Sequence, residues 1–279
     1  MAIDLPSDFT LLHKMTVHAY LQDYRTLDND GWRILLEAFD LLRKARLVRG
    51  NRVWTFEEIY RHALEGRYAT QFLEQLLAMA HPLHEGIPLK AQIARQILTD
   101  LTADGWYDPQ ETGSKYLLAY AYYWWDSFAK GYILEVSIFR DLDAAGILYT
   151  AHNILDPTER MAICDLIIEG WQGDIKTSTY FLHASRTSAL PHDFYITRLF
   201  DTSRKVWVCA VLMRPAVWQD LNGDVLVADI RQAAQFFPSA VQIDLVEGRF
   251  VVLDYKVWKD RVRALQRRKR EYNEREDYR

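Results

Sequence analysis

One short segment in the middle of the chain constrains the fold more than any other, because two strand-like runs flank a glycine-rich turn. The segment from Cys164 to Ser178 reads CDLIIEGWQGDIKTS. An apolar run precedes Gly170, and a strand-like pattern resumes after Gly173, so the pattern predicts a β-hairpin. Because alternate residues of a strand share a face, charged side chains of both strands can gather on one side of the hairpin.

Three charged residues of this hairpin are expected to share a face. With the turn centred just after Gly170, Asp165 is expected to face Lys176, and Ile167 is expected to face Asp174. Asp174 and Lys176 are two residues apart and therefore point to the same side. A shift of one residue in the strand pairing would separate the acids from each other.

Two carboxylates held side by side in an apolar sheet repel each other, and a shared proton or a bound cation relieves the repulsion. Oxygen ligands favour a hard cation, so Mg²⁺ or Mn²⁺ is expected between Asp165 and Asp174. Lys176 beside that cation would orient or deprotonate a water molecule aimed at a phosphodiester. The pattern therefore predicts metal-assisted hydrolysis of a phosphate ester.

The arrangement of Asp165, a short hairpin and then Asp174-Ile175-Lys176 resembles the core signature of the PD-(D/E)XK nuclease superfamily, which has the restriction-endonuclease-like fold. The resemblance covers roughly residues 132 to 213. It implies that Asp165, Asp174 and the backbone carbonyl of Ile175 are metal ligands, and that Lys176 orients water or stabilises the transition state. The proline that names the motif is absent before Asp165, and residues 179–183 do not reproduce the glutamine-and-tyrosine pattern of RecB-like members.

The helix that precedes the hairpin in that family commonly supplies a further acid, and here the matching segment contains Glu135. This residue lies among Tyr132, Phe139 and Leu142 on an otherwise apolar helical face. A buried glutamate needs a partner because an unpaired buried charge is costly. The resemblance therefore implies that Glu135 is a catalytic residue and a metal ligand.

The fold and function expected from these residues can be stated together. We expect an α/β protein whose residues 111–279 form a catalytic domain with a mixed sheet flanked by helices, preceded by a helical recognition or partner-binding domain over residues 1–110. The expected activity is that of a metal-dependent endonuclease acting on DNA, with RNA as an alternative substrate, and the resemblance implies a restriction or genome-defence role and a homodimer. The alternative is a catalytically silent nucleic-acid-binding or protein-interaction module, in which the charges form a cross-strand ion pair on solvated strands.

Charge and composition restrict the classes of protein to which this chain can belong. The net charge of −4 and the pI of about 6.1 argue against a histone-like, nonspecific nucleic-acid binder. The two cysteines, Cys164 and Cys209, offer neither a disulfide framework nor zinc spacing, so we expect a cytoplasmic protein. The longest aromatic-aliphatic stretch, Tyr116–Trp125, is too short to span a bilayer, so no membrane partner is expected. We interpret this stretch as a buried helix, with a stacking platform for bases as the alternative.

Periodicity predicts the remaining elements. Apolar residues at helical spacing predict helices over 11–21, 32–47, 56–64, 72–79, 87–101, 115–128 and a separate helix after Gly131. Thr55 and Glu58 predict a capping box, Gly50 predicts a helix end, and the turn-rich segment Asp108–Ser114 predicts the domain boundary. Two further strand pairs are expected over 193–213 and 241–255, with a charged helix from Trp258 to about Glu276.

Two smaller groups of residues have open interpretations. The basic run Arg43–Arg52 is expected either to grip phosphates or to complement the carbonyl end of a helix. His183, His192 and Asp193 are expected either to contact phosphate or to belong to an ordinary polar loop.

Overall fold

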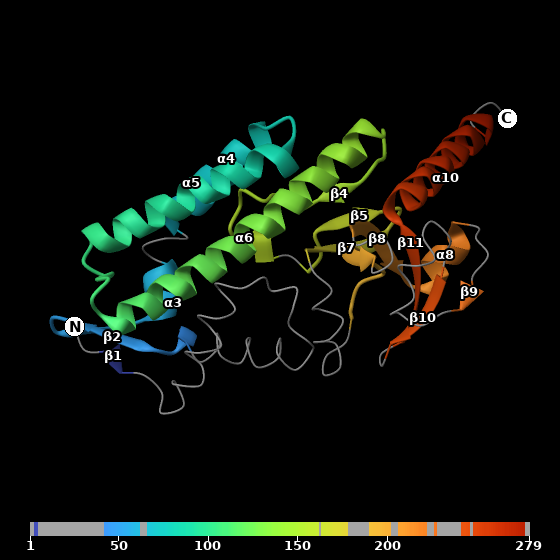
Figure 1. Cartoon of the computed structure of the whole chain (residues 1–279). Coiled ribbons are helices and arrows are strands. Elements are labelled where there is room, and N and C mark those ends of the chain that lie inside the picture. The colour runs from blue at the N-terminus through green and yellow to red at the C-terminus, as the bar shows by residue number, and fades with distance from the viewer. Residues whose placement is uncertain are drawn as a thin grey trace. The chain divides into compact units, whose positions relative to one another are not determined.

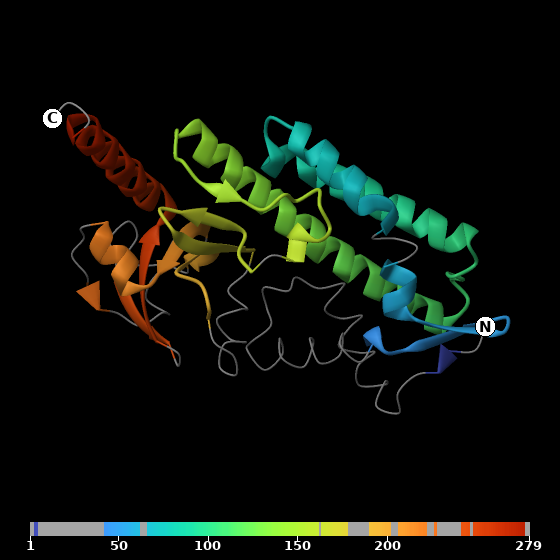
Figure 2. The ribbon, with the colours of Figure 1, turned by 180° about the vertical axis from the view of Figure 1, so that it is seen from behind.

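The computed structural model describes residues 3–4, 42–61, 66–161, 163–177, 190–201, 206–221, 226–227, 241–245 and 248–276 (Figures 1 and 2). The chain is mixed α/β and divides into two compact units, Met1–Ile133 and Leu134–Arg279. The helix expected over 11–21, residues 178–182 and His183 lie outside the described residues. None of the helices in the described part of the chain is long and apolar enough to cross a membrane.

The first unit contains a small antiparallel sheet, whereas the sequence predicts a helical domain with a helix over 32–47 and a helix end at Gly50. The sheet has the order β1-β2-β3, formed by Ile3–Asp4, Arg46–Arg49 and Arg52–Thr55. Gly50 lies in the two-residue turn between β2 and β3, with φ +60°, and does not end a helix. The prediction was wrong because β-branched and aromatic residues around a Gly-Asn turn favour a hairpin over the helical spacing of their neighbours.

Helices follow this sheet, largely as predicted. They are α3 (Phe56–Ile59), α4 (Gly66–Ala78) and α5 (Pro82–Ala103). The predicted capping box is confirmed: the Glu58 amide donates to the Thr55 hydroxyl at 3.1 Å, and the Thr55 amide donates to the Glu58 carboxylate at 2.7 Å.

A single helix, α6 (Thr112–Ala144), replaces the two helices expected on either side of Gly131. A side chain at Gly131 would meet no atom within 4 Å, and this partly exposed glycine leaves the helix unbroken. The aromatic run of α6 buries Tyr116, Tyr120 and Trp125, in agreement with the buried-helix interpretation. The turn at Asp108–Ser114 joins α5 to α6, whereas the division between the compact units falls inside α6, after Ile133.

The second unit is built on an eight-stranded mixed sheet with the order β4-β5-β6-β7-β8-β11-β10-β9. All neighbouring strands are antiparallel except the pairs β6–β7 and β9–β10. The predicted antiparallel pairs β7–β8 and β10–β11 are confirmed. The strands are β4 (Thr150–Ala151), β5 (Leu166–Ile168), β6 (Trp171–Lys176), β7 (Phe194–Asp201), β8 (Val206–Met213), β9 (Leu226–Val227), β10 (Val241–Leu245) and β11 (Gly248–Asp254).

Apolar side chains cover both faces of this sheet. One core contains Ile175, Phe194 and Val211 of the strands together with residues of α6, α8 (Pro215–Asp220) and α10 (Tyr255–Glu276). The opposite face has a smaller core that includes Tyr195 and Leu212. Asp174 pairs with Tyr195 and therefore lies on this second face, one residue away from the main core.

The predicted hairpin is confirmed, but its register differs by two residues. Leu166 pairs with Gly173 and Ile167 with Gln172, so Ile167 does not face Asp174 and Asp165 does not face Lys176. Glu169 and Gly170 form the turn with φ of +54° and +88°, because a two-residue turn with both residues left-handed matches the strand twist. A shift of two residues preserves the face of every side chain, so the acids remain together.

Gly173 is required by a close approach between β6 and β7. A Cβ atom at this position would lie 2.1 Å from the Phe194 ring, which is fully buried. We expect Gly173→Ala to lower the free energy of unfolding by roughly 1–3 kcal/mol, because the packed core cannot absorb the clash. Urea denaturation would measure the loss, and Phe194→Leu should restore part of it in the double variant. Equal stability of Gly173→Ala and the parent would contradict this packing argument.

Candidate functional site

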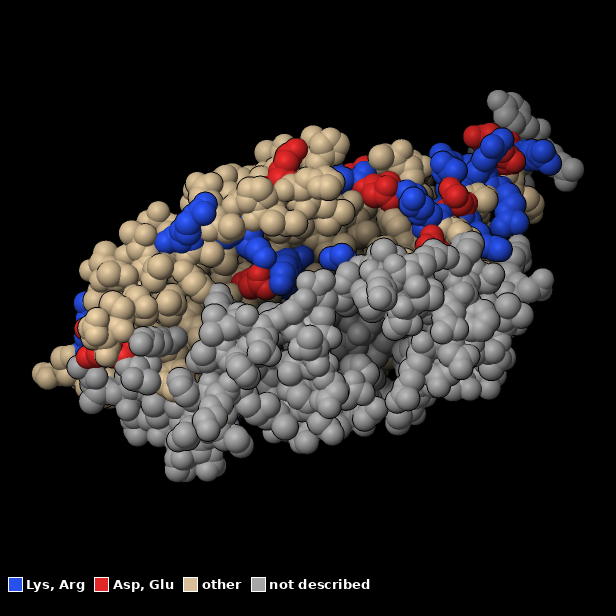
Figure 3. Space-filling view, viewed as in Figure 1, with Lys and Arg blue, Asp and Glu red and all other residues tan. Residues whose placement is uncertain are grey.

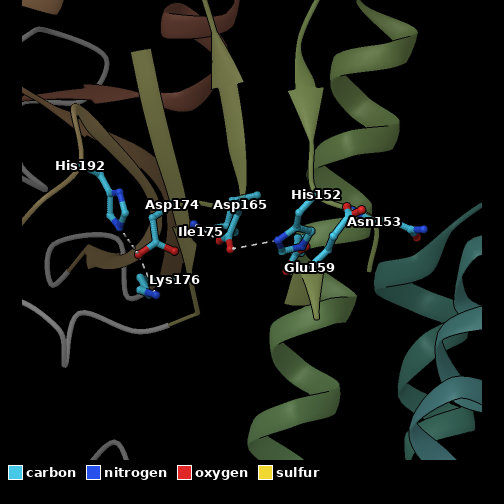
Figure 4. Close-up of polar contacts among 9 residues, drawn as sticks. His152, Asn153, Glu159, Asp165, Asp174, Ile175, Lys176 and His192 are labelled. Carbon is cyan, nitrogen blue, oxygen red and sulfur yellow. Dashed lines mark hydrogen bonds and ion pairs between the residues drawn. The ribbon is translucent and has the colours of Figure 1, made fainter. Parts of the chain in front are cut away.

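Three neighbouring strands place three side chains in one row across the edge of the sheet. His152 directly follows β4, and its amide donates to the Asp165 carbonyl at 3.3 Å. The Asp165 amide in turn donates to the Gly173 carbonyl at 3.0 Å, immediately before Asp174. Figure 4 shows His152, Asp165 and Asp174 along this row. The strand pairing therefore brings together residues that are up to 22 positions apart in the chain.

The two aspartates contact each other through their carboxyl groups. Asp165 accepts a hydrogen bond from the Ile175 amide at 2.6 Å and shares a hydrogen bond with Asp174. Asp174 is 5% exposed. Burial, followed by the hydrogen bond with Asp174 and the charges of Glu135 and Asp174, raises the pKa of Asp165 to about 8. This pair therefore holds a proton at neutral pH unless a cation replaces it.

Glu135 joins the site from α6 through His152. Its carboxylate lies 2.6 Å from His152 Nε2, and both side chains are less than one-tenth exposed. Figure 2 shows β4 and β5 beside the C-terminal part of α6, which carries Glu135. Burial raises the pKa of Glu135, and the hydrogen bond to Glu135 raises the pKa of His152. The partner that a buried glutamate requires is thus a histidine.

Lys176 and His192 flank Asp174. Lys176 Nζ lies 2.7 Å from Asp174 Oδ2, and the lysine side chain is 42% exposed. His192 Nε2 lies 3.6 Å from the same oxygen, and burial lowers the pKa of His192. Arg214 fixes the His192 segment, because its guanidinium donates to the carbonyls of Leu190 and His192. In the described part of the chain, Lys176 is thus a solvent-accessible cation beside a buried acid.

The structure places the side chains of Glu135, Asp165, Asp174 and Lys176 close together. Ile175 contacts the site through its amide, and its side chain packs in the main core. Two of the residues that were expected either to contact phosphate or to belong to a polar loop are described. His192 lies at the site, while Asp193 accepts a hydrogen bond from the Gln172 amide at 2.8 Å.

The donor set fits a divalent metal ion. One ligand atom from each of Glu135, His152 and Asp165 lies within 4.8 Å of the other two. With His152 Nε2 hydrogen-bonded to Glu135, His152 Nδ1 is buried and has no hydrogen-bond partner among the described residues. It lies 4.0 Å from Asp165 Oδ1, which is too long for a hydrogen bond and close to twice a metal–ligand bond of roughly 2.1 Å. Carboxylates are common ligands of Mg²⁺ and Mn²⁺, whereas imidazole is a common ligand of Zn²⁺, Fe and other transition metals.

His152 and His192 were not identified as partners of the acids by sequence reasoning. His152 follows a strand of only two residues, and such a short strand has no periodicity to detect. His192 was weighed as a phosphate contact or a polar-loop residue, and the residues between Lys176 and His192 gave no pattern that paired it with Asp174.

Comparison with known proteins gives no relative: no protein-family model, curated protein or solved structure matches this chain. The functional inference therefore rests on the geometry and chemistry of the site.

Proposed function

We propose that this protein is a metal-dependent endonuclease that hydrolyses DNA phosphodiester bonds, with an active site of the PD-(D/E)XK kind. The observation that carries the proposal is the buried Asp165–Asp174 pair, flanked on one side by His152 and on the other by the accessible amine of Lys176. Buried like charges are costly to a fold, and they are retained where a cation or a reaction needs them.

Each residue has a role in this proposal. Asp165, Asp174 and His152 would hold Mn²⁺ or Mg²⁺, which when bound would neutralise negative charge on the scissile phosphate. Glu135 accepts a hydrogen bond from His152 Nε2–H and so holds the ring in one orientation, with Nδ1 directed at Asp165. Glu135 is therefore proposed as the residue that positions a ligand rather than as the principal ligand.

Lys176 is the catalytic residue at the exposed side of the pair. Its ammonium group, 2.7 Å from Asp174, can donate to an attacking water molecule or to a phosphate oxygen without moving its backbone. Burial of Asp174 keeps this ion pair oriented, while the 42% exposure of Lys176 leaves room for substrate. Lys176 thereby orients the attacking water and places a positive charge beside the reacting phosphate.

The proposed roles of the two domains follow from the position of this site in the chain. We propose that residues 111–279 contain the restriction-endonuclease-like catalytic domain and that residues 1–110 bind substrate or a partner. Both cysteines are free thiols, in keeping with a reducing cytoplasm. A homodimer that cuts both strands is part of the proposal, as is a role in restriction or genome defence.

The test is cleavage of plasmid DNA by the full chain with Mn²⁺, with Mg²⁺ and with EDTA. We expect nicking or linearisation with Mn²⁺, less with Mg²⁺ and none with EDTA. Asp174→Ala should abolish cleavage, whereas Asp220→Ala, which removes an exposed acid of α8, should leave the rate unchanged. An RNA of matched length in parallel reactions tests the alternative substrate.

The competing function is a catalytically silent nucleic-acid-binding or protein-interaction module. The Lys176–Asp174 ion pair is the observation that favours it, since the same contact can simply stabilise two neighbouring strands. In that case the parent protein would leave DNA and RNA intact with every metal, and Asp174→Ala would bind nucleic acid as the parent does.

A further inference from the structure

The β2–β3 hairpin of the first unit contributes two arginines and one tryptophan to a compact cluster that also contains Trp106, which follows α5. Arg49 and Arg52 are direct cross-strand partners beside the turn, on the face that also carries Trp54. The Arg52 guanidinium lies 3.6 Å from the centre of the Trp54 ring, and that of Arg49 lies 4.5 Å from the centre of the Trp106 ring. The two indoles meet edge to face with their centres 5.7 Å apart. We call these four residues the Arg–Trp cluster.

Among the described residues, the two arginines of this cluster form no direct ion pair, and the nearest acid effect is the attraction between Arg52 and Glu58. Like charges directly opposite each other destabilise a hairpin, and both arginines are exposed. The nearby Arg43 and Arg61, in contrast, both pair with Glu57. An anion bound at the hairpin would remove this repulsion.

Contact with the indole rings holds the two guanidinium groups in orientations that suit an anion. A guanidinium lying over an indole is held in place through its face, while its N–H donors remain at the edge. This planar edge matches the oxygens of a phosphate group, which arginine binds with two parallel hydrogen bonds. The Arg–Trp cluster therefore presents two preoriented phosphate-binding groups on adjacent strands.

We propose that the Arg–Trp cluster binds the phosphate backbone of duplex DNA and so defines the substrate class of the proposed nuclease, on whose function this assignment rests. A two-stranded ribbon fits the major groove of a duplex. Proteins that bind single strands expose aromatic rings on which bases stack. Here Trp106 is only 7% exposed, and each indole is covered by an arginine or by the other indole.

The C-terminal helix α10 is a weaker candidate for the same role, although it is rich in basic residues. Figure 3 shows acidic and basic side chains intermixed over α10. Arg263 pairs with Asp260, and Lys269 pairs with Glu169. Arg267 pairs with Glu271, so much of the positive charge of this helix is already compensated within the second unit.

The test is fluorescence anisotropy of a labelled 30-base-pair duplex with the full chain in EDTA, at several salt concentrations. We expect Arg49→Gln/Arg52→Gln to weaken binding at least about tenfold and to reduce the slope of log affinity against log salt by about 1.8. Arg49→Lys/Arg52→Lys keeps the charge but loses the planar stacked edge, so it should keep the slope and still lose affinity. The matched control Arg95→Gln/Lys130→Gln removes the same charge from exposed positions of the same unit.

The outcomes separate this proposal from the nuclease proposal. Equal duplex binding by the Arg49→Gln/Arg52→Gln variant and the control variant would overturn the role of the cluster. Tighter binding of the single strand than of the duplex would overturn the choice of duplex DNA. Loss of duplex binding in the glutamine variant, together with a parent protein that never cleaves, would support the cluster and reject the nuclease.

Discussion

Replacing Lys176 by methionine is expected to lower the rate of DNA cleavage by at least about a hundredfold while the protein remains folded. Methionine has nearly the length of lysine but can neither donate a proton nor carry charge, so the phosphate loses a positive group beside the buried Asp174. Single-turnover cleavage of plasmid with saturating Mn²⁺ measures the effect on the chemical step.

Three measurements distinguish a catalytic role of Lys176 from a purely structural role. Asp174 is buried, so loss of its cationic partner should lower the thermal midpoint, and cleavage is therefore measured below the midpoint of the variant. Lys176 is not a proposed ligand, so Mn²⁺ should raise the midpoint of the variant and of the parent alike. Lys176→Arg keeps the charge and should recover part of the rate. A methionine variant that cleaves at the parental rate would remove Lys176 from the mechanism.

The sequence predicted the elements near the site because each had its own local signal. Alternating apolar residues predicted the hairpin, and the spacing of Asp174 and Lys176 placed them on one face irrespective of the exact turn. The register was wrong because the glycine at 173 was interpreted as part of the turn. It lies instead within β6, where the Phe194 ring leaves no space for a side chain.

Contacts between distant segments could not be predicted in the same way. His152 reaches Asp165 because a two-residue strand pairs with β5, and pairing of two residues leaves no pattern in a single sequence. The β2–β3 hairpin was missed for a different reason, since the run from Trp32 to Leu47 has helical spacing and the strands begin at its end. Long-range pairing decided the position of His152, whereas the residues around the Gly50-Asn51 turn decided the hairpin locally.

When no metal is present, the acidic pair Asp165–Asp174 lowers the free energy of unfolding, and this loss can be measured. Replacing Asp165 by asparagine is expected to raise the free energy of unfolding in EDTA at pH 8 by on the order of 2 kcal/mol. Asparagine keeps an oxygen that can accept the Ile175 amide, and its amide group can donate to Asp174. The variant therefore retains the hydrogen bonds and removes a buried charge.

The sign of the pH dependence follows from the raised pKa of Asp165. Burial, the hydrogen bond with Asp174 and the charges of Glu135 and Asp174 raise this pKa to about 8 in the folded chain, whereas the unfolded value is about 3.9. The folded state thus keeps a proton that the unfolded state loses, and stability falls as the pH rises from about 4 to about 8. The advantage of Asp165→Asn should therefore be small at pH 4 and largest at pH 8, as measured by urea denaturation.

Metal addition should reverse the order of stability. A ligand that binds only the folded state at a concentration of one hundred times its Kd stabilises that state by about 2.7 kcal/mol. Mn²⁺ should therefore stabilise the parent at pH 8 and have little effect on Asp165→Asn, which lacks a charged ligand, and the variant should not cleave DNA. Asp220→Asn, at an exposed position of α8, should respond to Mn²⁺ as the parent does. An asparagine variant that is less stable in EDTA, or that gains as much from Mn²⁺, would show that the acidic pair is not a metal site.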